Sequence, residues 1–293
     1  MKLTDLWRPK SRPTISCELF PAQDAKAEGN LHKAIDKLAV LGPDFFSVTF
    51  GAGGATRAGS YALAQALKAN RKLETLAYVA GYGLGPDDLC GVLDGYQTLG
   101  IDNVFVVRGD VPKADEPLAA HPQSLAHASD MLSFVRERFR FCLGAAGYPE
   151  GHKEAPSREA DRAYLKLKVA RGAEFIITQY FYDNQTFLDF VTACRAMGIS
   201  VPIIAGVMPI YNLKLMDNLA QLCGATITEP VRRGLAAVAA DDKDGVHNFG
   251  VSFAVEQCRA LIGAGVQGLH FYTMDRSKSV IEIVQRLRSE GLL

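Results

Sequence analysis

The chain has 293 residues, 48% of them hydrophobic, and equal numbers of basic and acidic side chains, 32 of each. The balanced charge argues against a nucleic-acid partner, and no apolar run approaches the roughly 18 residues that span a membrane. The N-terminal segment lacks the apolar core of a signal peptide. We therefore expect a cytoplasmic protein with neither a nucleic-acid nor a membrane partner.

The six cysteines are scattered and form no C-x-x-C pair. Cys17 and Cys142 lie within apolar runs, which is typical of reduced, buried thiols and not of a disulfide framework or a zinc site. The six histidines also lack the spacing of metal ligands. We therefore expect no intrinsic metal site.

Short apolar runs alternate with amphipathic stretches along the whole chain. The runs are too short and too rich in β-branched residues for helices, which is typical of buried parallel strands. The expected strands are residues 15–20, 45–50, 75–80, 103–107, 141–147, 174–179, 202–208 and 266–272. The expected helices are residues 26–41, 57–70, one beginning at Pro86, 122–139, 157–171, 184–197, 212–223, 230–239, 246–263 and 278–290.

Eight strand–helix units without a linker predict an α/β protein, a single-domain (β/α)8 TIM barrel over residues 1–293. Residues 1–13 would be a short N-terminal extension. A doubly wound open sheet is the alternative fold. No G-x-G-x-x-G follows the first strand to favour it.

Polar side chains cluster at the ends of the expected strands, where a barrel of this kind has its active site. Residues 104–107 end abruptly in Arg108, Gly109 and Asp110, and the glycine allows the backbone to approach a ligand closely. The alternative is an Arg–Asp ion pair that closes a loop. The strand-end residues are Glu18, Thr49, Gly51, Tyr78, Arg108, Asp110, Tyr148, His152, Gln179, Tyr211, Asn212, Tyr272, Thr273 and Arg276.

Glu18 is the most informative of these residues because it lies inside an apolar strand. Burial of a carboxylate is costly, so its pKa should rise, and a neutral carboxylic acid is suited to donating a proton near neutral pH. The alternative is a barrel glutamate that pairs with a neighbouring arginine.

Two further patterns leave alternatives open. The glycine-rich residues 51–57 fit a phosphate site or a plain turn. Asp161, Lys166 and Lys168 fit a phosphate and ribose site or a solvated helix face.

Six motifs follow one another along most of the chain: ELFP with Glu18, SVTFGAGGATR from Ser47, VRGD from Val107, AGYPEGH from Ala146, ITQYFYD from Ile177 and LHFYTMDR from Leu269. In their residues, order and spacing they resemble the motifs of the methylenetetrahydrofolate reductase family. The resemblance runs from about residue 14 to the C-terminus. The length resembles the short bacterial type.

The resemblance implies FAD at the C-terminal ends of the strands and reduction of 5,10-methylenetetrahydrofolate to 5-methyltetrahydrofolate. NADH or NADPH would give hydride to the flavin and leave, and the folate would then take it in ping-pong fashion. This places the protein in one-carbon metabolism and methionine biosynthesis. We also expect a homo-oligomer.

The family's residue roles fall on matching positions of this chain. Glu18 would be the general acid that protonates a folate nitrogen as the ring opens to an iminium. Asp110 would be the second catalytic residue, beside both flavin and substrate, while Gln179 and Arg276 would bind the folate. The FAD contacts would be Thr49, Phe50, Ala52, Tyr78, Arg108, Gly109, Asp110, Ala128, Tyr148, His152, Ala155, Asp161 and Lys168.

Three positions depart from the family pattern. Tyr78 replaces a histidine at the third strand end, Leu213 replaces an aromatic residue after the seventh strand, and Asp275 replaces an asparagine after the eighth. The first two weaken the expectation of a standard NADH site. A partner protein that delivers electrons to the same barrel is therefore an alternative.

Two other hypotheses concern different classes of protein. A barrel lyase or isomerase acting on a phosphorylated substrate would need a lysine or a metal in the pocket, and no expected strand ends in lysine. A binding subunit would leave the chemistry to its partner. The presence of Glu18, Asp110 and Gln179 argues against such an inactive site.

Overall fold

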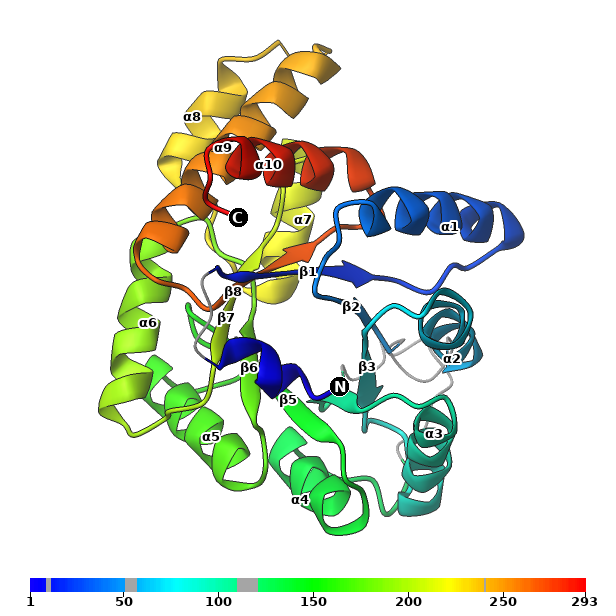
Figure 1. Cartoon of the computed structure of the whole chain (residues 1–293). Coiled ribbons are helices and arrows are strands. Elements are labelled where there is room, and N and C mark those ends of the chain that lie inside the picture. The colour runs from blue at the N-terminus through cyan, green and yellow to red at the C-terminus, as the bar shows by residue number, and fades with distance from the viewer. Residues whose placement is uncertain (9–11, 51–56, 110–120, 240) are drawn as a thin grey trace.

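The computed structural model describes residues 1–8, 12–50, 57–109, 121–239 and 241–293, with only the backbone of Leu213. Eight parallel strands close into a barrel in sequence order (Figure 1), and β8 pairs with β1 through Thr14 opposite Gly268. The strands are β1 (Thr14–Leu19), β2 (Phe45–Val48), β3 (Thr75–Ala80), β4 (Asn103–Val107), β5 (Cys142–Gly147), β6 (Phe175–Thr178), β7 (Ile203–Val207) and β8 (Gly268–Tyr272). The predicted TIM barrel is confirmed.

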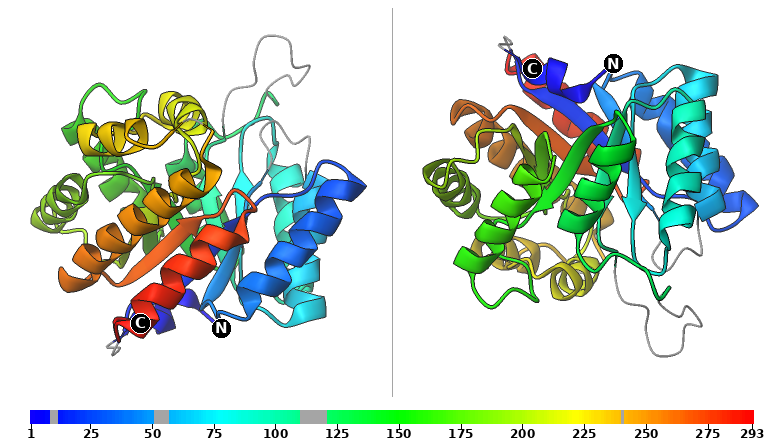
Figure 2. Two further views of the ribbon diagram at one scale, coloured as in Figure 1. Left: turned by 90° about the horizontal axis from the view of Figure 1, so that it is seen from above. Right: turned by 90° about the horizontal axis from the view of Figure 1, so that it is seen from below.

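The helices lie outside the strands, as the views along and across the barrel show (Figures 1 and 2). They are α1 (Ala25–Ala39), α2 (Arg57–Gln65), α3 (Pro86–Thr98), α4 (Ala128–Arg138), α5 (Arg158–Ala170), α6 (Asn184–Ala196), α7 (Leu213–Cys223), α8 (Glu229–Ala236), α9 (Lys243–Gly263) and α10 (Ser277–Ser289). Among the described residues, no helix has the length and apolar content needed to cross a membrane.

Most helices begin close to where the sequence predicts, and caps explain several starts. The Ser157 hydroxyl accepts a hydrogen bond from the Ala160 amide at 3.1 Å and caps α5. The helix predicted over 122–139 was wrong at its start, because α4 begins at Ala128. Pro122 instead lies in a turn that the Ser124 amide closes on the His121 carbonyl at 2.9 Å.

The predicted helix over 57–70 is also not one regular α-helix. After α2 the chain widens into the π-helical turn η3 (Ala66–Asn70). After β7, by contrast, the three predicted helical pieces are all present. The chain there forms α7, α8 and α9, which share a separate apolar cluster containing Val231, Leu235 and Ile210.

The barrel interior is filled by side chains that point inward from alternate strand positions. Phe45, Phe105 and Phe175 form its centre. The 3₁₀ helix η1 (Leu3–Trp7) contributes Trp7, whose ring centroid lies 5.1 Å from that of Phe175. The first residues of the chain thus pack against the interior at the N-terminal end of the strands.

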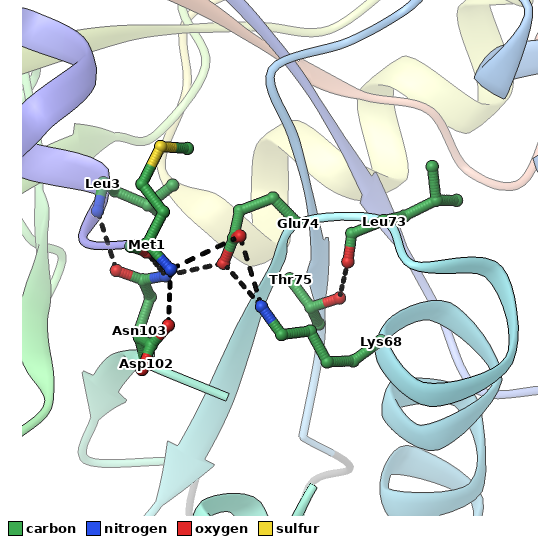
Figure 3. A network of polar contacts seen from close by, with 8 residues as sticks. All are labelled: Met1, Leu3, Lys68, Leu73, Glu74, Thr75, Asp102 and Asn103. Carbon is green, nitrogen blue, oxygen red and sulfur yellow. Dashed lines mark hydrogen bonds and ion pairs between the residues drawn. The ribbon is translucent and has the colours of Figure 1, made fainter. Parts of the chain in front are cut away.

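A polar network holds this N-terminal segment in place (Figure 3). The side-chain amide of Asn103 donates to the Met1 carbonyl at 2.9 Å and to Glu74 at 3.0 Å, while its oxygen accepts from the Leu3 amide at 2.8 Å. Lys68 pairs with the same Glu74 carboxylate at 3.2 Å. Asn103 is fully buried, so these contacts replace the water that it loses on folding.

Replacement of Asn103 by alanine should lower the free energy of unfolding by about 1–3 kcal/mol, because it leaves the Leu3 amide and the Met1 carbonyl without their partner. Urea unfolding of Asn103→Ala beside the parent measures this effect. The control is Asn248→Ala, which removes the same side chain from an exposed position on α9. Equal stability of the two variants would show that the network contributes nothing.

Candidate functional site

A cavity of about 450 Å³ opens at the C-terminal end of the barrel. The strands or the turns that follow them supply most of its wall. The lining includes Glu18, Phe20, Thr49, Phe50, Tyr78, Arg108, Gly109, Tyr148, His152, Gln179 and Tyr272. The structure therefore brings together most of the strand-end residues that the sequence singled out.

Glu18 lies on β1 with Ser47 opposite it on β2 and Tyr272 opposite it on β8. Its side chain is only 4% exposed, and the Tyr78 hydroxyl donates a hydrogen bond to Oε2 at 2.9 Å. Burial raises the pKa of Glu18 to about 8, and the carboxylate of Asp275 adds to the rise, while the Tyr78 hydrogen bond opposes it. The carboxyl group is therefore largely protonated near neutral pH.

A second cavity of about 380 Å³ lies beside the first and shares Arg108, Ala146, Tyr148 and His152 with it. Ala128 of α4 and Ala155, before α5, line it, as do Asp161 and Lys168 of α5. The two cavities form one elongated site that leads from the barrel mouth to the gap between these helices. Tyr164 and Leu167, which are unusually exposed for large apolar residues, also line this part.

Arg108 occupies the junction of the two cavities. Its guanidinium forms a bidentate ion pair with the Glu154 carboxylate, with N–O distances of 2.6 and 2.9 Å. The next residue, Gly109, has a φ of 87°, and a Cβ there would come within 3.2 Å of both Ala80 and Tyr82. Only glycine fits this turn without strain, which fixes the direction in which the chain leaves β4.

A group of three titratable residues lies in the second cavity. Lys168 donates to the Ala146 carbonyl at 2.6 Å, and burial lowers its pKa to about 8 despite the nearby Asp161. Burial raises the pKa of Asp161 and lowers that of His152. Lys168 is thus a partly desolvated cation in this cavity, and such a cation suits an anionic ligand.

Gln179 follows β6 and lines the first cavity. Its backbone amide donates to the Gly147 carbonyl at 2.8 Å, and its side-chain oxygen accepts from the Tyr180 amide at 3.0 Å. With the oxygen fixed in this way, the side-chain NH₂ is the group that remains for a ligand.

Among the described residues to which the resemblance assigns a role, Arg276 is the one that lines neither cavity. The strand-end residues Tyr211, Asn212 and Thr273 also line neither cavity. Arg276 lines a separate cavity of about 500 Å³, where its guanidinium lies 5.0 Å from the centre of the Tyr211 ring. The neighbouring Asp275 has a φ of 55°, a conformation that asparagine and aspartate tolerate best among non-glycine residues. Its Oδ1 accepts from the Phe20 amide at 3.1 Å, beside the first cavity.

Several expected residues lie outside the described part of the chain. These are Gly51, Ala52 and Asp110, together with the rest of the glycine-rich residues 51–56 and the side chain of Leu213. Their assigned roles stay predictions.

The structure also shows site residues that the sequence did not single out. Glu154 pairs with Arg108, and Leu222 and Cys223 of α7 form part of the cavity wall. Tyr164 and Leu167 of the second cavity were also not singled out. For these two alone the sequence held a clue, because they are apolar residues among the polar ones of α5. The positions of Glu154 and of the end of α7 depend on how distant segments pack.

The fold and the site define a (β/α)8 barrel with a buried acid at its mouth and an elongated cavity beside it. A family model described as methylenetetrahydrofolate reductase matches residues 2–288, and the chain belongs to this family.

Two curated relatives illustrate the range of lengths in this family. The chain is 35% identical over 299 aligned positions to methylenetetrahydrofolate reductase 1 of Schizosaccharomyces pombe, and this alignment covers all of this chain and 49% of the relative. It is 32% identical over 273 residues to 5,10-methylenetetrahydrofolate reductase of Escherichia coli, and this alignment covers 93% of this chain and 90% of the relative. The chain thus spans about half the length of the first relative and most of the second.

Solved structures share the fold at lower sequence identity. A protein from Clostridium thermocellum, described as binding two copies of 5-methyl-5,6,7,8-tetrahydrofolic acid, superposes with a TM-score of 0.61 at 16% identity over 95% of each chain. At this identity the similarity concerns the fold alone.

The raised pKa of Glu18 predicts that Glu18→Gln stabilises the ligand-free protein in alkaline solution. Between about pH 4.5 and 8 the folded protein keeps a proton that the unfolded chain releases, so the contribution of Glu18 to stability falls as the pH rises. The glutamine avoids this loss, and we expect a gain of about 4–5 kcal/mol near pH 9 and almost none near pH 4.5.

Urea unfolding at both pH values measures this difference. The matched control is Glu137→Gln, at a position where the side chain is 70% exposed. A gain that does not depend on pH would contradict the buried, protonated state of Glu18.

Proposed function

We propose that the protein is a flavin-dependent reductase that converts 5,10-methylenetetrahydrofolate to 5-methyltetrahydrofolate. The observation that carries the proposal is the protonated Glu18 at the mouth of a barrel whose motifs match the family. The chemistry requires an acid at this point, because the folate ring opens only when the departing nitrogen gains a proton. A buried carboxyl group with a pKa of about 8 meets that requirement.

The residues of the elongated site fit FAD. Lys168 would bind the pyrophosphate, with Arg108 beside it once the ligand competes with Glu154 for the guanidinium. The apolar Tyr164 and Leu167 would offer a surface for an adenine ring. Thr49 and Tyr148 would hold the flavin at the barrel mouth. When bound, FAD would accept hydride from a reductant and pass it to the folate.

Different side chains would protonate, orient and bind the folate. Glu18 gives its proton to the ring nitrogen, and the carbon–nitrogen bond breaks with its electron pair going to that nitrogen, which leaves an iminium carbon. Gln179 orients the pterin through its side-chain NH₂. Arg276, held against Tyr211 in its separate cavity, would pair with the negatively charged glutamate of a substrate that extends that far.

Replacement of Glu18 by glutamine should lower the rate of the folate half-reaction by at least about a hundredfold, because the amide cannot supply the proton. Reduction of the flavin by its electron donor should stay close to the parent rate. Anaerobic stopped-flow measurement at the flavin absorbance band separates the two half-reactions. Normal folate turnover by the variant would refute the assignment of Glu18 as the acid.

The same measurement identifies the electron donor. Bleaching of the bound flavin by NADH or NADPH would establish a nicotinamide donor. Flavin that neither one reduces, although dithionite reduces it, would indicate delivery by a partner protein. A purified protein that binds no FAD would refute the flavin mechanism.

The second cavity predicts that Lys168→Gln weakens FAD binding by about tenfold or more, because a partly desolvated cation is lost beside the phosphates. Fluorescence titration of the flavin-free protein with FAD and with FMN measures this effect. The control is Lys166→Gln, an exposed lysine on the same helix. Equal affinities of the parent for FAD and FMN would contradict a role of this cavity in binding the adenosine half.

A further inference from the structure

Tyr78 stands where the family pattern has a histidine, and the structure shows what the tyrosine contacts. Tyr78 lies on β3 and Glu18 on β1, so the tyrosine reaches across β2 to donate its hydrogen bond. The residue opposite Glu18 on β2 is Ser47, and its side chain also forms a hydrogen bond with Tyr78. Both partners are buried, and both line the cavity at the barrel mouth.

Tyr78 is itself held in place by one contact at its ring and another at its backbone. It stacks on Phe105 with 4.5 Å between the ring centroids, and Phe105 is its register partner on β4. The Tyr96 hydroxyl of α3 donates to the Tyr78 carbonyl at 2.9 Å. With the ring and the backbone both fixed, the hydroxyl has a defined direction toward Glu18.

The hydrogen bond distinguishes the two oxygens of the Glu18 carboxyl group. Oε2 accepts from Tyr78, whereas Oε1 accepts no hydrogen bond from any described residue, and the side chain lines the cavity. An oxygen that accepts such a hydrogen bond is the carbonyl-like one, so the acidic proton resides on Oε1.

We propose that Tyr78 is a positioning residue that holds Glu18 with its protonated oxygen, Oε1, toward the substrate. The inference rests on the proposed function, because it assigns Tyr78 a part in the proton transfer from Glu18. In that step the Oε1–H bond breaks and the folate nitrogen gains the proton. The Tyr78 hydroxyl then donates to the carboxylate that remains, and so stabilises the charge that appears in the buried site.

The groups around Glu18 set the expected pH dependence. Among the described residues they are Tyr78 on β3, Tyr272 on β8, Ser47 on β2 and Asp275 after β8. Only the Tyr78 hydrogen bond lowers the pKa of Glu18, whereas burial and Asp275 raise it. Loss of this hydroxyl should therefore make Glu18 a weaker acid.

The test is Tyr78→Phe in the flavin-loaded protein, with the folate half-reaction followed over a range of pH. We expect a rate about tenfold lower near neutral pH, from the loss of one hydrogen bond to a developing charge. The alkaline decline in rate, which reports ionisation of Glu18, should move to higher pH. Tyr78→His, which restores a donor, should recover part of the rate.

Infrared difference spectra of the flavin-free protein give a readout that does not depend on activity. The carbonyl band of protonated Glu18, assigned by its absence in Glu18→Gln, should shift to higher wavenumber in Tyr78→Phe because a hydrogen bond to Oε2 is lost. The control is Tyr61→Phe, at a tyrosine of α2 that lines neither cavity and has no part in holding Tyr78. This control should move neither the band nor the alkaline limb.

The outcomes separate this inference from the proposed function. If the parent reduces no methylenetetrahydrofolate, the proposed function fails and the infrared band still tests the hydrogen bond. If the parent is active, and Tyr78→Phe keeps both the band and the alkaline limb of the parent, the positioning role is refuted. A slower variant whose pH profile is unchanged would also refute it, since it would show a merely structural role.

Discussion

The cost of placing a carboxyl group inside an apolar barrel governs the chemistry of this site. Glu18 points inward because residues alternate along β1, and the interior that it meets contains Phe45, Phe105 and Phe175. Among the described residues no lysine or arginine pairs with it. Arg108, which lines the same cavity, is bound to Glu154 instead. The carboxyl group therefore avoids its desolvation penalty by keeping its proton, which makes it an acid and not half of a structural ion pair.

The two ends of the barrel use polar groups in opposite ways. At the N-terminal end, Asn103 and Glu74 have their hydrogen-bonding capacity met by the first residues of the chain and by Lys68, so this end is closed and stabilising. At the C-terminal end, Oε1 of Glu18 and the side-chain NH₂ of Gln179 have no such partner among the residues that the structure describes. This division agrees with the general rule that barrel enzymes bind ligands where the strands end and gain stability at the opposite face.

The sequence predicted the parts of the structure that depend on local patterns. The strands agree within two residues because buried parallel strands form short apolar runs, and Glu18 was recognisable because a charge interrupts such a run. The predicted start of α4 was wrong because a proline such as Pro122 fits a turn as well as the first turn of a helix. Only the hydrogen bond to the His121 carbonyl distinguishes the two. Glu154 and Leu222 were missed because their place in the site depends on how distant segments pack.

Two of the departures from the family pattern converge on the same carboxyl group. Tyr78 donates a hydrogen bond to Glu18 and lowers its pKa, whereas Asp275 places a second carboxylate nearby and raises it. Asp275 also holds the backbone of β1 close to this point, through the Phe20 amide, and Thr273 donates to the Glu18 carbonyl at 2.6 Å. An asparagine at position 275 could keep the hydrogen bond to Phe20 without the charge. The acid strength of Glu18 therefore depends on Tyr78 and Asp275 together, since the tyrosine offsets what the aspartate adds.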